Sequence, residues 1–332
     1  MTTPTTGPDL PPAVRTEERF FEDLPGFPFA PNYGEVAHPH DASRLRMHYV
    51  DEGPPDGPVV LMVHGEPTWS YLYRKLIPVF AAAGFRAVAV DLIGFGRSDK
   101  PTRSSHYSFE NHIAWLRELV VGIDLRDITL VCQDWGGPIS LGVLAREPDR
   151  FARVMAGNTM LHTADPALAG RLAWEAHASS DADSTVSAAL LDWMHLSHRA
   201  VDFPAGPAVA GATARGLSPE VIAAYDAPFP TEWHRAGMRQ FPVLIPVTRS
   251  DPGAAINRAT WDALANFDRP FLTLFGDADP GTGGWERVFQ ERVPGAQGQP
   301  HAILSNTGHF WQEDCGAEVA AQIVAWIGRE GA

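Results

Sequence analysis

The hydrophobic positions of the chain fall into short apolar runs and longer stretches with helical periodicity. Runs rich in β-branched residues predict strands, and the longer periodic stretches predict helices. The predicted strands are residues 47–51, 59–63, 86–90, 128–132, 153–156, 270–275 and 301–304. The predicted helices include 69–83, 109–122, 136–146 and 315–328, the last with Val319, Ile323 and Trp326 at helical spacing. This alternation is typical of a mostly parallel sheet that helices cover on both faces.

Two segments depart from this alternation. The first thirty or so residues are polar and rich in Pro and Thr, which indicates a tail rather than a domain. Residues 160–240 are rich in Ala and show no strand pattern, so we interpret them as a helical cap above the carboxyl edge of the sheet. The predicted organisation is therefore a core in two parts, 1–159 and 241–332, interrupted by a cap at 160–240.

Composition and charge exclude several partners. The 26 Lys and Arg residues are outnumbered by 40 Asp and Glu residues, which gives a net charge of −14. Such a chain repels nucleic acid and anionic membranes. The two cysteines, Cys132 and Cys315, make no CxxC pair or disulfide framework,. The N-terminal segment does not have the pattern of a secretory signal. We therefore expect a cytoplasmic protein that binds neither nucleic acid nor membrane.

The most informative motif is VCQDWGG at residues 131–137, where a predicted strand ends and a predicted helix begins. A nucleophile elbow needs a small residue two positions before and two positions after the nucleophile, because its turn is tight. Cys132 and Gly136 satisfy this requirement around Asp134. An Asp at a helix start is also an ordinary N-cap, but a cap requires no flanking small residues. The motif predicts a nucleophilic carboxylate in an α/β-hydrolase fold.

The partners of Asp134 are expected in the order nucleophile, acid, histidine. His309 lies in NTGHFWQED, between the last apolar run and the C-terminal helix, where we expect the general base. Two acids compete within FGDADP, Asp277 and Asp279. We favour Asp279, because the acid normally stands a few residues beyond its strand and reaches across to the imidazole.

The loop HGEPTWSYLYR at 64–74 follows a predicted strand and opens a helix. In this fold that loop and the residue after the nucleophile supply the backbone N–H groups of the oxyanion hole, here Glu66 and Trp135. We expect His64 to shape the turn rather than act as a base. The GxG in DLIGFGRSDKP (91–101) lacks the third glycine of a dinucleotide fingerprint, so we interpret it as a structural loop.

Together HGEPTWSYLYR, DLIGFGRSDKP, QDWGG, YDAPFP (225–230) and GHFWQED closely resemble the haloalkane dehalogenases, from about residue 20 to the C-terminus. The resemblance implies an α/β-hydrolase fold with a mostly parallel eight-stranded sheet, flanking helices and an inserted helical cap. It makes Asp134 the nucleophile, His309 the general base and Asp279 the triad acid. It also implies hydrolysis of carbon–halogen bonds with no cofactor or metal.

The same resemblance implies a halide site made of two tryptophans. Trp135 matches the first, and the second lies on a cap helix. Trp193 and Trp174 compete for that place; Trp193 is favoured because the Phe, Pro and Gly that follow it have the spacing of the family. Phe203, Phe241 and Pro242 resemble pocket-wall positions, although ordinary core packing explains them nearly as well.

These residue types suit displacement of halide from an sp³ carbon. Carboxylates are ionised at neutral pH and need no base to attack, and an indole N–H is a donor with no acceptor capacity. The expected partners are a haloalkane, water and the released halide, and the expected assembly is a monomer or a small homo-oligomer.

Three rival functions use related groups. Epoxide hydrolases share the Asp nucleophile but need two cap tyrosines, and only Tyr225 of the six tyrosines falls in the predicted cap. Fluoroacetate-type dehalogenases typically carry an Arg directly after the nucleophile, where this chain has Trp135. A non-catalytic binding protein on the same fold would have lost catalytic groups, whereas all of them are present.

Overall fold

The computed structural model describes residues 11–165 and 188–330 of the chain. The strands are β1 Ala13–Val14, β2 Asn32–Ala37, β3 Arg44–Glu52, β4 Val59–Val63, β5 Arg86–Val90, β6 Lys100–Pro101, β7 Ile128–Cys132, β8 Phe151–Ala156, β9 Phe271–Gly276 and β10 Ala302–Leu304. The α-helices are α1 Ile77–Ala82, α2 Phe109–Gly122, α3 Gly136–Leu144, α5 Ala188–Arg199, α6 Ala205–Gly211, α7 Pro219–Asp226, α8 Ala236–Gln240, α9 Pro252–Leu264, α10 Trp285–Arg292 and α11 Trp311–Glu330. In the described part, none of these helices is both long and apolar enough to cross a bilayer.

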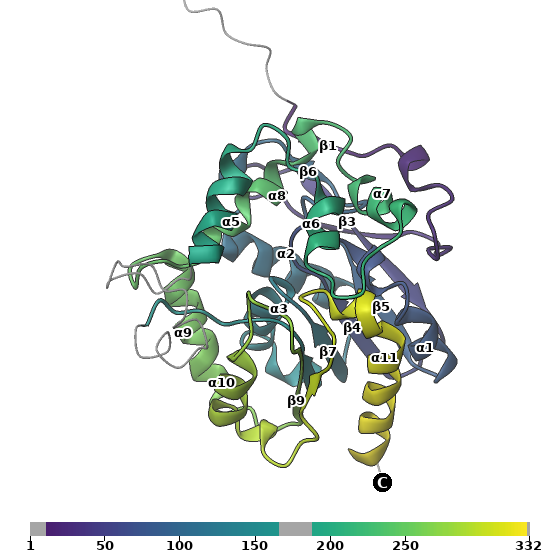
Figure 1. Ribbon diagram of the computed structural model, residues 1–332, viewed down its shortest axis with the longest axis vertical. Coiled ribbons are helices and arrows are strands. Elements are labelled where there is room, and N and C mark those ends of the chain that lie inside the picture. Colours follow the sequence, from purple (N-terminus) through teal and green to yellow (C-terminus); the bar gives the residue numbers. More distant parts are fainter. Residues whose placement is uncertain (1–10, 166–187, 331–332) are drawn as a thin grey trace, which may run out of the picture.

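Eight strands form one sheet in the order β10-β9-β8-β7-β4-β5-β3-β2. Only β3 runs against its neighbours, β5 and β2, and all other pairs are parallel. In Figure 1, α1 and α11 lie on one side of the central strands, and α3 and α9 lie on the other. The predicted mostly parallel eight-stranded sheet is therefore confirmed.

The central strands are buried on both faces, which is why they appear in the sequence as unbroken apolar runs. Every residue of β4 and β7 is buried, and both strands have the predicted bounds. On α11, Val319, Ile323 and Trp326 are buried as their spacing predicted.

Two expectations about the elements were wrong, and one strand of the eight-stranded sheet was missed. Residues 69–83 do not form one helix: a 3-10 turn at Ser70–Tyr73 precedes α1, which begins at Ile77 because Pro78 is accepted only in the first helical turn,. Helix α11 begins at Trp311 and is kinked at Cys315, where the predicted helix started. Strand β2 was missed because only Val36 of this edge strand is buried.

The described part of residues 160–240 is helical, and Figure 1 shows α5, α6, α7 and α8 gathered at one end of the sheet. Two acidic residues at the start of α11 connect this helical segment to the core. Glu313 receives hydrogen bonds from Arg74 of the core and Tyr225 of α7. Asp314 accepts the backbone N–H groups of Arg215 at 2.8 Å and of Gly308 at 2.8 Å. The predicted boundaries of the cap, 160 and 240, stay a prediction.

Candidate active site

Asp134 lies in the tight turn between β7 and α3. Its φ of +50° is a left-handed backbone conformation that few residues other than Gly, Asn and Asp adopt,. The turn leaves little room: a Cβ on Gly136 would come within 2.0 Å of the Val63 carbonyl oxygen, and one on Gly65 within 2.1 Å of Asp134 Oδ1. These glycines allow the backbone to approach closely enough to expose the Asp134 carboxylate above the sheet.

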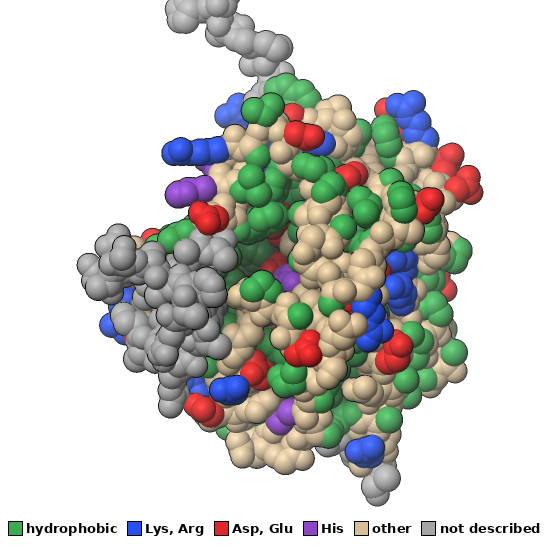
Figure 2. Space-filling view, in the orientation of Figure 1, with side chains coloured by type: hydrophobic (Ala, Val, Ile, Leu, Met, Phe, Trp, Pro, Cys, Tyr) green, Lys and Arg blue, Asp and Glu red, His purple; other side chains and the backbone are tan. Residues whose placement is uncertain are grey.

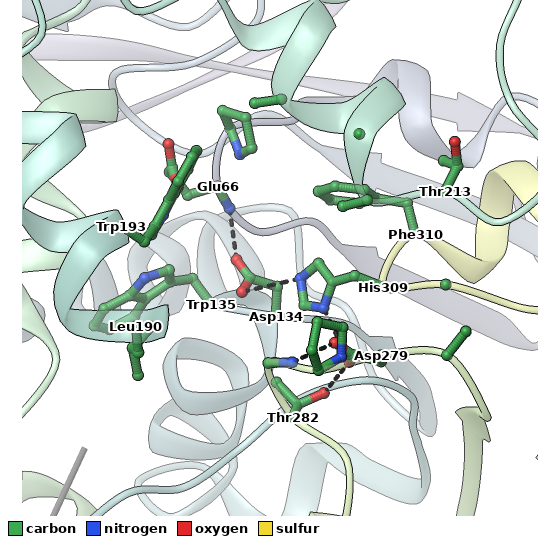
Figure 3. Close-up of a pocket in the computed structure, with 18 of the residues that line it drawn as sticks. Glu66, Asp134, Trp135, Leu190, Trp193, Thr213, Asp279, Thr282, His309 and Phe310 are labelled. Carbon is green, nitrogen blue, oxygen red and sulfur yellow. Dashed lines mark hydrogen bonds and ion pairs between the residues drawn. The ribbon is translucent and has the colours of Figure 1, made fainter. Parts of the chain in front are cut away.

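Two partners hold the Asp134 carboxylate. The backbone N–H of Glu66, in the loop after β4, donates to Oδ1 at 2.7 Å. His309 Nε2 lies 3.4 Å from Oδ2. One oxygen therefore meets a backbone donor and the other faces the imidazole, as Figure 3 shows.

Asp279 completes a line of three groups. Its Oδ2 lies 3.0 Å from His309 Nδ1, while its Oδ1 accepts the Gly281 N–H at 2.8 Å. Thr282 donates a hydrogen bond to Oδ2 as well. The competing candidate, Asp277, instead accepts the N–H groups of residues 306 and 307 at 3.1 Å. The geometry therefore supports Asp279 as the partner of the imidazole.

Neighbouring charges shift the pKa values of His309 and Asp279. Burial lowers the pKa of His309, but the negative charges of Asp279 and Asp134 outweigh burial and raise this pKa from 6.5 to about 10,. Burial raises the pKa of Asp279, yet the attraction of His309 and the hydrogen bonds of Asp279 together lower it below its ordinary value. The two carboxylates therefore favour the protonated form of the His309 imidazole.

Two polar residues of the site were missed from the sequence. Asn158, just after β8, accepts the Gly276 N–H on Oδ1 and donates from Nδ2 to the carbonyl oxygens of Gly308 and His309. Its own carbonyl accepts the Asp134 N–H at 2.9 Å. Asn158 thus connects the turn of Asp134 to the loop of His309. The Gln133 Nε2 lies 2.9 Å from His309 Nε2. In the sequence, only the position of Gln133 directly before Asp134 indicated that this residue belongs to the site.

The candidate halide residues flank Asp134. Trp135 is buried and packs against Phe109 and Phe241, with ring centroids 5.5 Å and 5.1 Å away. Trp193 of α5 reaches the same cavity, and its indole Nε1 donates to Glu66 Oε2 at 3.1 Å. The alternative residue, Trp174, lies outside the described residues.

A cavity of about 420 Å³ opens above these groups. Figure 2 shows it as a hollow bordered by hydrophobic side chains, with acidic and histidine atoms at its floor. Its lining includes Met160, Leu190, Ile245 and Phe310. The expected wall residues Phe203, Phe241 and Pro242 are buried but do not line this cavity. Phe203 packs on Trp193 with centroids 5.1 Å apart, and Phe241 packs behind Trp135.

The two loops that were predicted to be structural make hydrogen bonds within the core. His64 is buried, with Nδ1 2.8 Å from the Gly65 carbonyl oxygen and Nε2 accepting the Leu92 N–H at 3.0 Å. In the GxG loop, Asp91 is paired with His48 at 2.6 Å. Neither group faces the cavity.

Comparison with known proteins decides the family. A model of the α/β-hydrolase fold family matches residues 58–245. A haloalkane dehalogenase of Psychrobacter cryohalolentis is 45% identical over 95% of this chain and 97% of its own, and one of Mycobacterium marinum is 45% identical over 94% and 99%. The chain belongs to the haloalkane dehalogenases. A tetrameric haloalkane dehalogenase from Paraglaciecola agarilytica is similar in structure, with 36% identity, a TM-score of 0.80 and coverage of 93% and 97%.

Membership of the haloalkane dehalogenases makes the chain a hydrolase of carbon–halogen bonds, and its tyrosines agree with that assignment. All six tyrosines lie in the described part of the chain, and none of them lines the described cavity. The one tyrosine of the predicted cap, Tyr225, is buried and donates its O–H to Glu313. An epoxide oxygen above Asp134 would therefore meet no phenol among the described lining residues.

Proposed function

We propose that Asp134, His309 and Asp279 carry out haloalkane hydrolysis in two steps, with Trp135 and Trp193 receiving the halide. The observation that carries this proposal is the carboxylate of Asp134, which has a backbone donor at one oxygen and an imidazole at the other. The products are an alcohol, a halide ion and a proton.

In the first step, an Asp134 oxygen attacks the carbon that bears the halogen, from the side opposite the leaving group. A C–O bond forms and the carbon–halogen bond breaks, and its electron pair leaves with the halide. The indole N–H groups of Trp135 and Trp193 are the donors that stabilise the halide in an apolar cavity. The intermediate is an alkyl ester of Asp134.

In the second step, His309 removes a proton from water, which attacks the carboxyl carbon of the ester. The esterified Asp134 no longer carries a negative charge. Because that charge is one of those that raise the pKa of His309, alkylation lowers this pKa and prepares the imidazole to act as a base. The nucleophile thus controls the protonation of its partner.

The oxyanion of the tetrahedral intermediate needs hydrogen-bond donors. The Glu66 N–H already lies 2.7 Å from Asp134 Oδ1, and we assign the Trp135 N–H as the second donor. Each contact of this type contributes about 3–4 kcal/mol to the transition state. The intermediate then collapses: the C–O bond to the alkyl group's oxygen breaks, the alcohol leaves with a proton, and Asp134 is regenerated.

Asp279 holds the imidazole with Nδ1 facing the carboxylate, so that Nε2 faces Asp134 and the water. Its negative charge stabilises the imidazolium that forms when His309 takes the proton. Its buried hydrogen bonds from Thr282 and Gly281 keep the Asp279 carboxylate in one orientation.

We further propose that the chain acts in the cytoplasm as a monomer or small homo-oligomer. Both cysteines are free and buried, which suits a reducing compartment,. The tetramer formed by the similar Paraglaciecola agarilytica protein supports a small assembly. Light scattering of the full chain would give its mass in solution.

A single turnover in ¹⁸O-labelled water tests the covalent route. If Asp134 is the nucleophile, the first alcohol carries ¹⁶O from the carboxylate, and mass spectrometry finds ¹⁸O in the peptide that contains Asp134. If water displaces the halide directly, the first alcohol carries ¹⁸O and the peptide stays unlabelled. Parallel assays of halide release and epoxide consumption separate the two hydrolase activities.

A further inference from the structure

The indole N–H of Trp193 is engaged by a neighbouring residue. Trp193 Nε1 donates to Glu66 Oε2 at 3.1 Å, and Figure 3 shows the two side chains next to each other above Asp134. An indole has one N–H and no acceptor. A halide bound by Trp193 must therefore take the donor that Glu66 holds in this structure.

The Glu66 carboxyl group has unused hydrogen-bonding capacity. Glu66 is 5% exposed, and its Oε1 is buried without a hydrogen-bond partner in the described part of the chain. The backbone N–H of the same residue donates to Asp134, so the side chain is fixed within the reacting centre. A buried carboxylate with an unpaired oxygen is costly, and protonation reduces this cost.

We propose that the Glu66 side chain competes with the leaving halide for the indole N–H of Trp193, and that it thereby sets halide affinity and promotes halide release. This inference rests on the proposed halide site of Trp135 and Trp193. It assigns to the carboxyl group of Glu66 a role separate from that of its backbone N–H in the oxyanion hole.

The competition depends on the charge of Glu66. Burial and the nearby Asp134 carboxylate raise the pKa of Glu66 well above its ordinary value, while the Trp193 hydrogen bond and the His309 charge oppose this. The charged groups that face Glu66 are thus Asp134 and His309, with Asp279 behind the imidazole. A neutral carboxyl group is a modest acceptor that gives up the indole to a halide.

An ionised Glu66 behaves differently. A carboxylate binds the indole N–H more strongly, because the hydrogen bond is charge-assisted, and it repels the halide. Halide affinity is therefore expected to fall as the pH rises through the pKa of Glu66. After the halide leaves, Glu66 takes the N–H back, so that Trp193 keeps a partner between turnovers.

The test is the affinity of the full-length resting enzyme for bromide, measured by calorimetry from about pH 6 to about pH 9, at constant ionic strength. For Glu66→Gln, which cannot ionise, we expect bromide to bind about tenfold more tightly than to wild type at the alkaline end, as for one charge-assisted hydrogen bond. The difference should shrink toward acid pH. Glu286→Gln, which removes a buried carboxyl group on α10, is the matched control and should follow wild type.

Trp193→Phe separates a failure of the proposed halide site from a failure of the proposed role of Glu66. If this variant binds bromide as tightly as wild type, the halide site itself is wrong. If it binds more weakly but Glu66→Gln parallels wild type at every pH, the role of Glu66 is overturned. Should Glu66→Gln fail to fold, the pH profiles of wild type and Trp193→Phe decide instead: the alkaline loss of affinity must be smaller without the indole, and equal losses contradict the inference.

Discussion

The two halves of the site are built differently. The half on the core places Asp134, Asp279 and His309 in turns and loops that follow β7, β9 and β10, and backbone hydrogen bonds fix each of them. The half on the cap presents Trp193 from α5, where only Ser197 is buried among residues 190–199. In the proposed mechanism the covalent chemistry and one halide donor, Trp135, belong to the core, whereas the second halide donor, Trp193, belongs to a helix with less packing. Less packed elements open at lower free-energy cost, which suits the entry of a substrate and the exit of a halide.

The largest expected effect belongs to the core half. Replacement of Asp134 by Ala removes the proposed nucleophile, and we expect haloalkane turnover to fall by at least about 10⁴-fold. Chloride or bromide release reports the loss, and circular dichroism checks the fold. A variant that keeps substantial dehalogenation would show that the chemistry does not depend on this turn.

The triad acid is expected to have the next largest effect. Asp279→Asn removes the charge that stabilises the imidazolium, so hydrolysis of the alkyl-enzyme should slow by about 10³- to 10⁴-fold. Asp277→Asn, two residues earlier on the surface, is the matched control and should keep wild-type turnover. If Asp277→Asn slowed hydrolysis and Asp279→Asn kept wild-type turnover, the triad acid would be Asp277.

The connection between the halves should have a smaller effect. Asp314 joins the loop of His309 to residues 214 and 215 beside the cavity. Asp314→Asn removes the negative charge and one of the two acceptor oxygens, and we expect KM to rise by about 3- to 10-fold with a smaller change in the alkylation rate. Asp268→Asn, an exposed site before β9, serves as the control. Equal losses in every step would instead indicate general destabilisation.

The two steps should also differ in their response to pH. The pKa of His309 in the resting enzyme is raised to about 10, and it falls when Asp134 is esterified. Below its pKa the imidazolium cannot accept a proton, so hydrolysis should accelerate with rising pH from about pH 6 to about pH 9, whereas alkylation should not accelerate. Rapid-quench measurement of alkyl-enzyme and alcohol separates the two rates. An alkylation rate that rises with pH as steeply as hydrolysis would contradict the assignment.

The contrast between the halves also explains what could be predicted from the sequence. Strands buried on both faces, such as β4, β5 and β7, appear as apolar runs whose ends coincide with the observed ones. The nucleophile turn follows from local sterics: small residues at 132 and 136 are visible without a structure. The order of Asp134, Asp279 and His309 along the chain follows from the fold.

Long-range contacts could not be predicted in the same way. The hydrogen bonds of Asn158 join residues up to 151 positions away, and the pairing of Glu66 with Trp193 spans 127 positions. The amphipathic pattern of the cap does not indicate which side chains turn toward the cavity. Phe203, Phe241 and Pro242 therefore could not be distinguished from ordinary core residues; Phe203 packs on Trp193, and Phe241 packs on Trp135.

The most direct test of the account uses His309→Gln with a haloalkane that the wild type converts. Since the proposed mechanism uses His309 only in hydrolysis, the variant should release one halide per active site and then stop. Mass spectrometry should find the alkyl group on Asp134. Two results would contradict the separate roles of Asp134 and His309. The variant could release no halide and form no adduct with any such substrate, or it could continue to turn over at the wild-type rate.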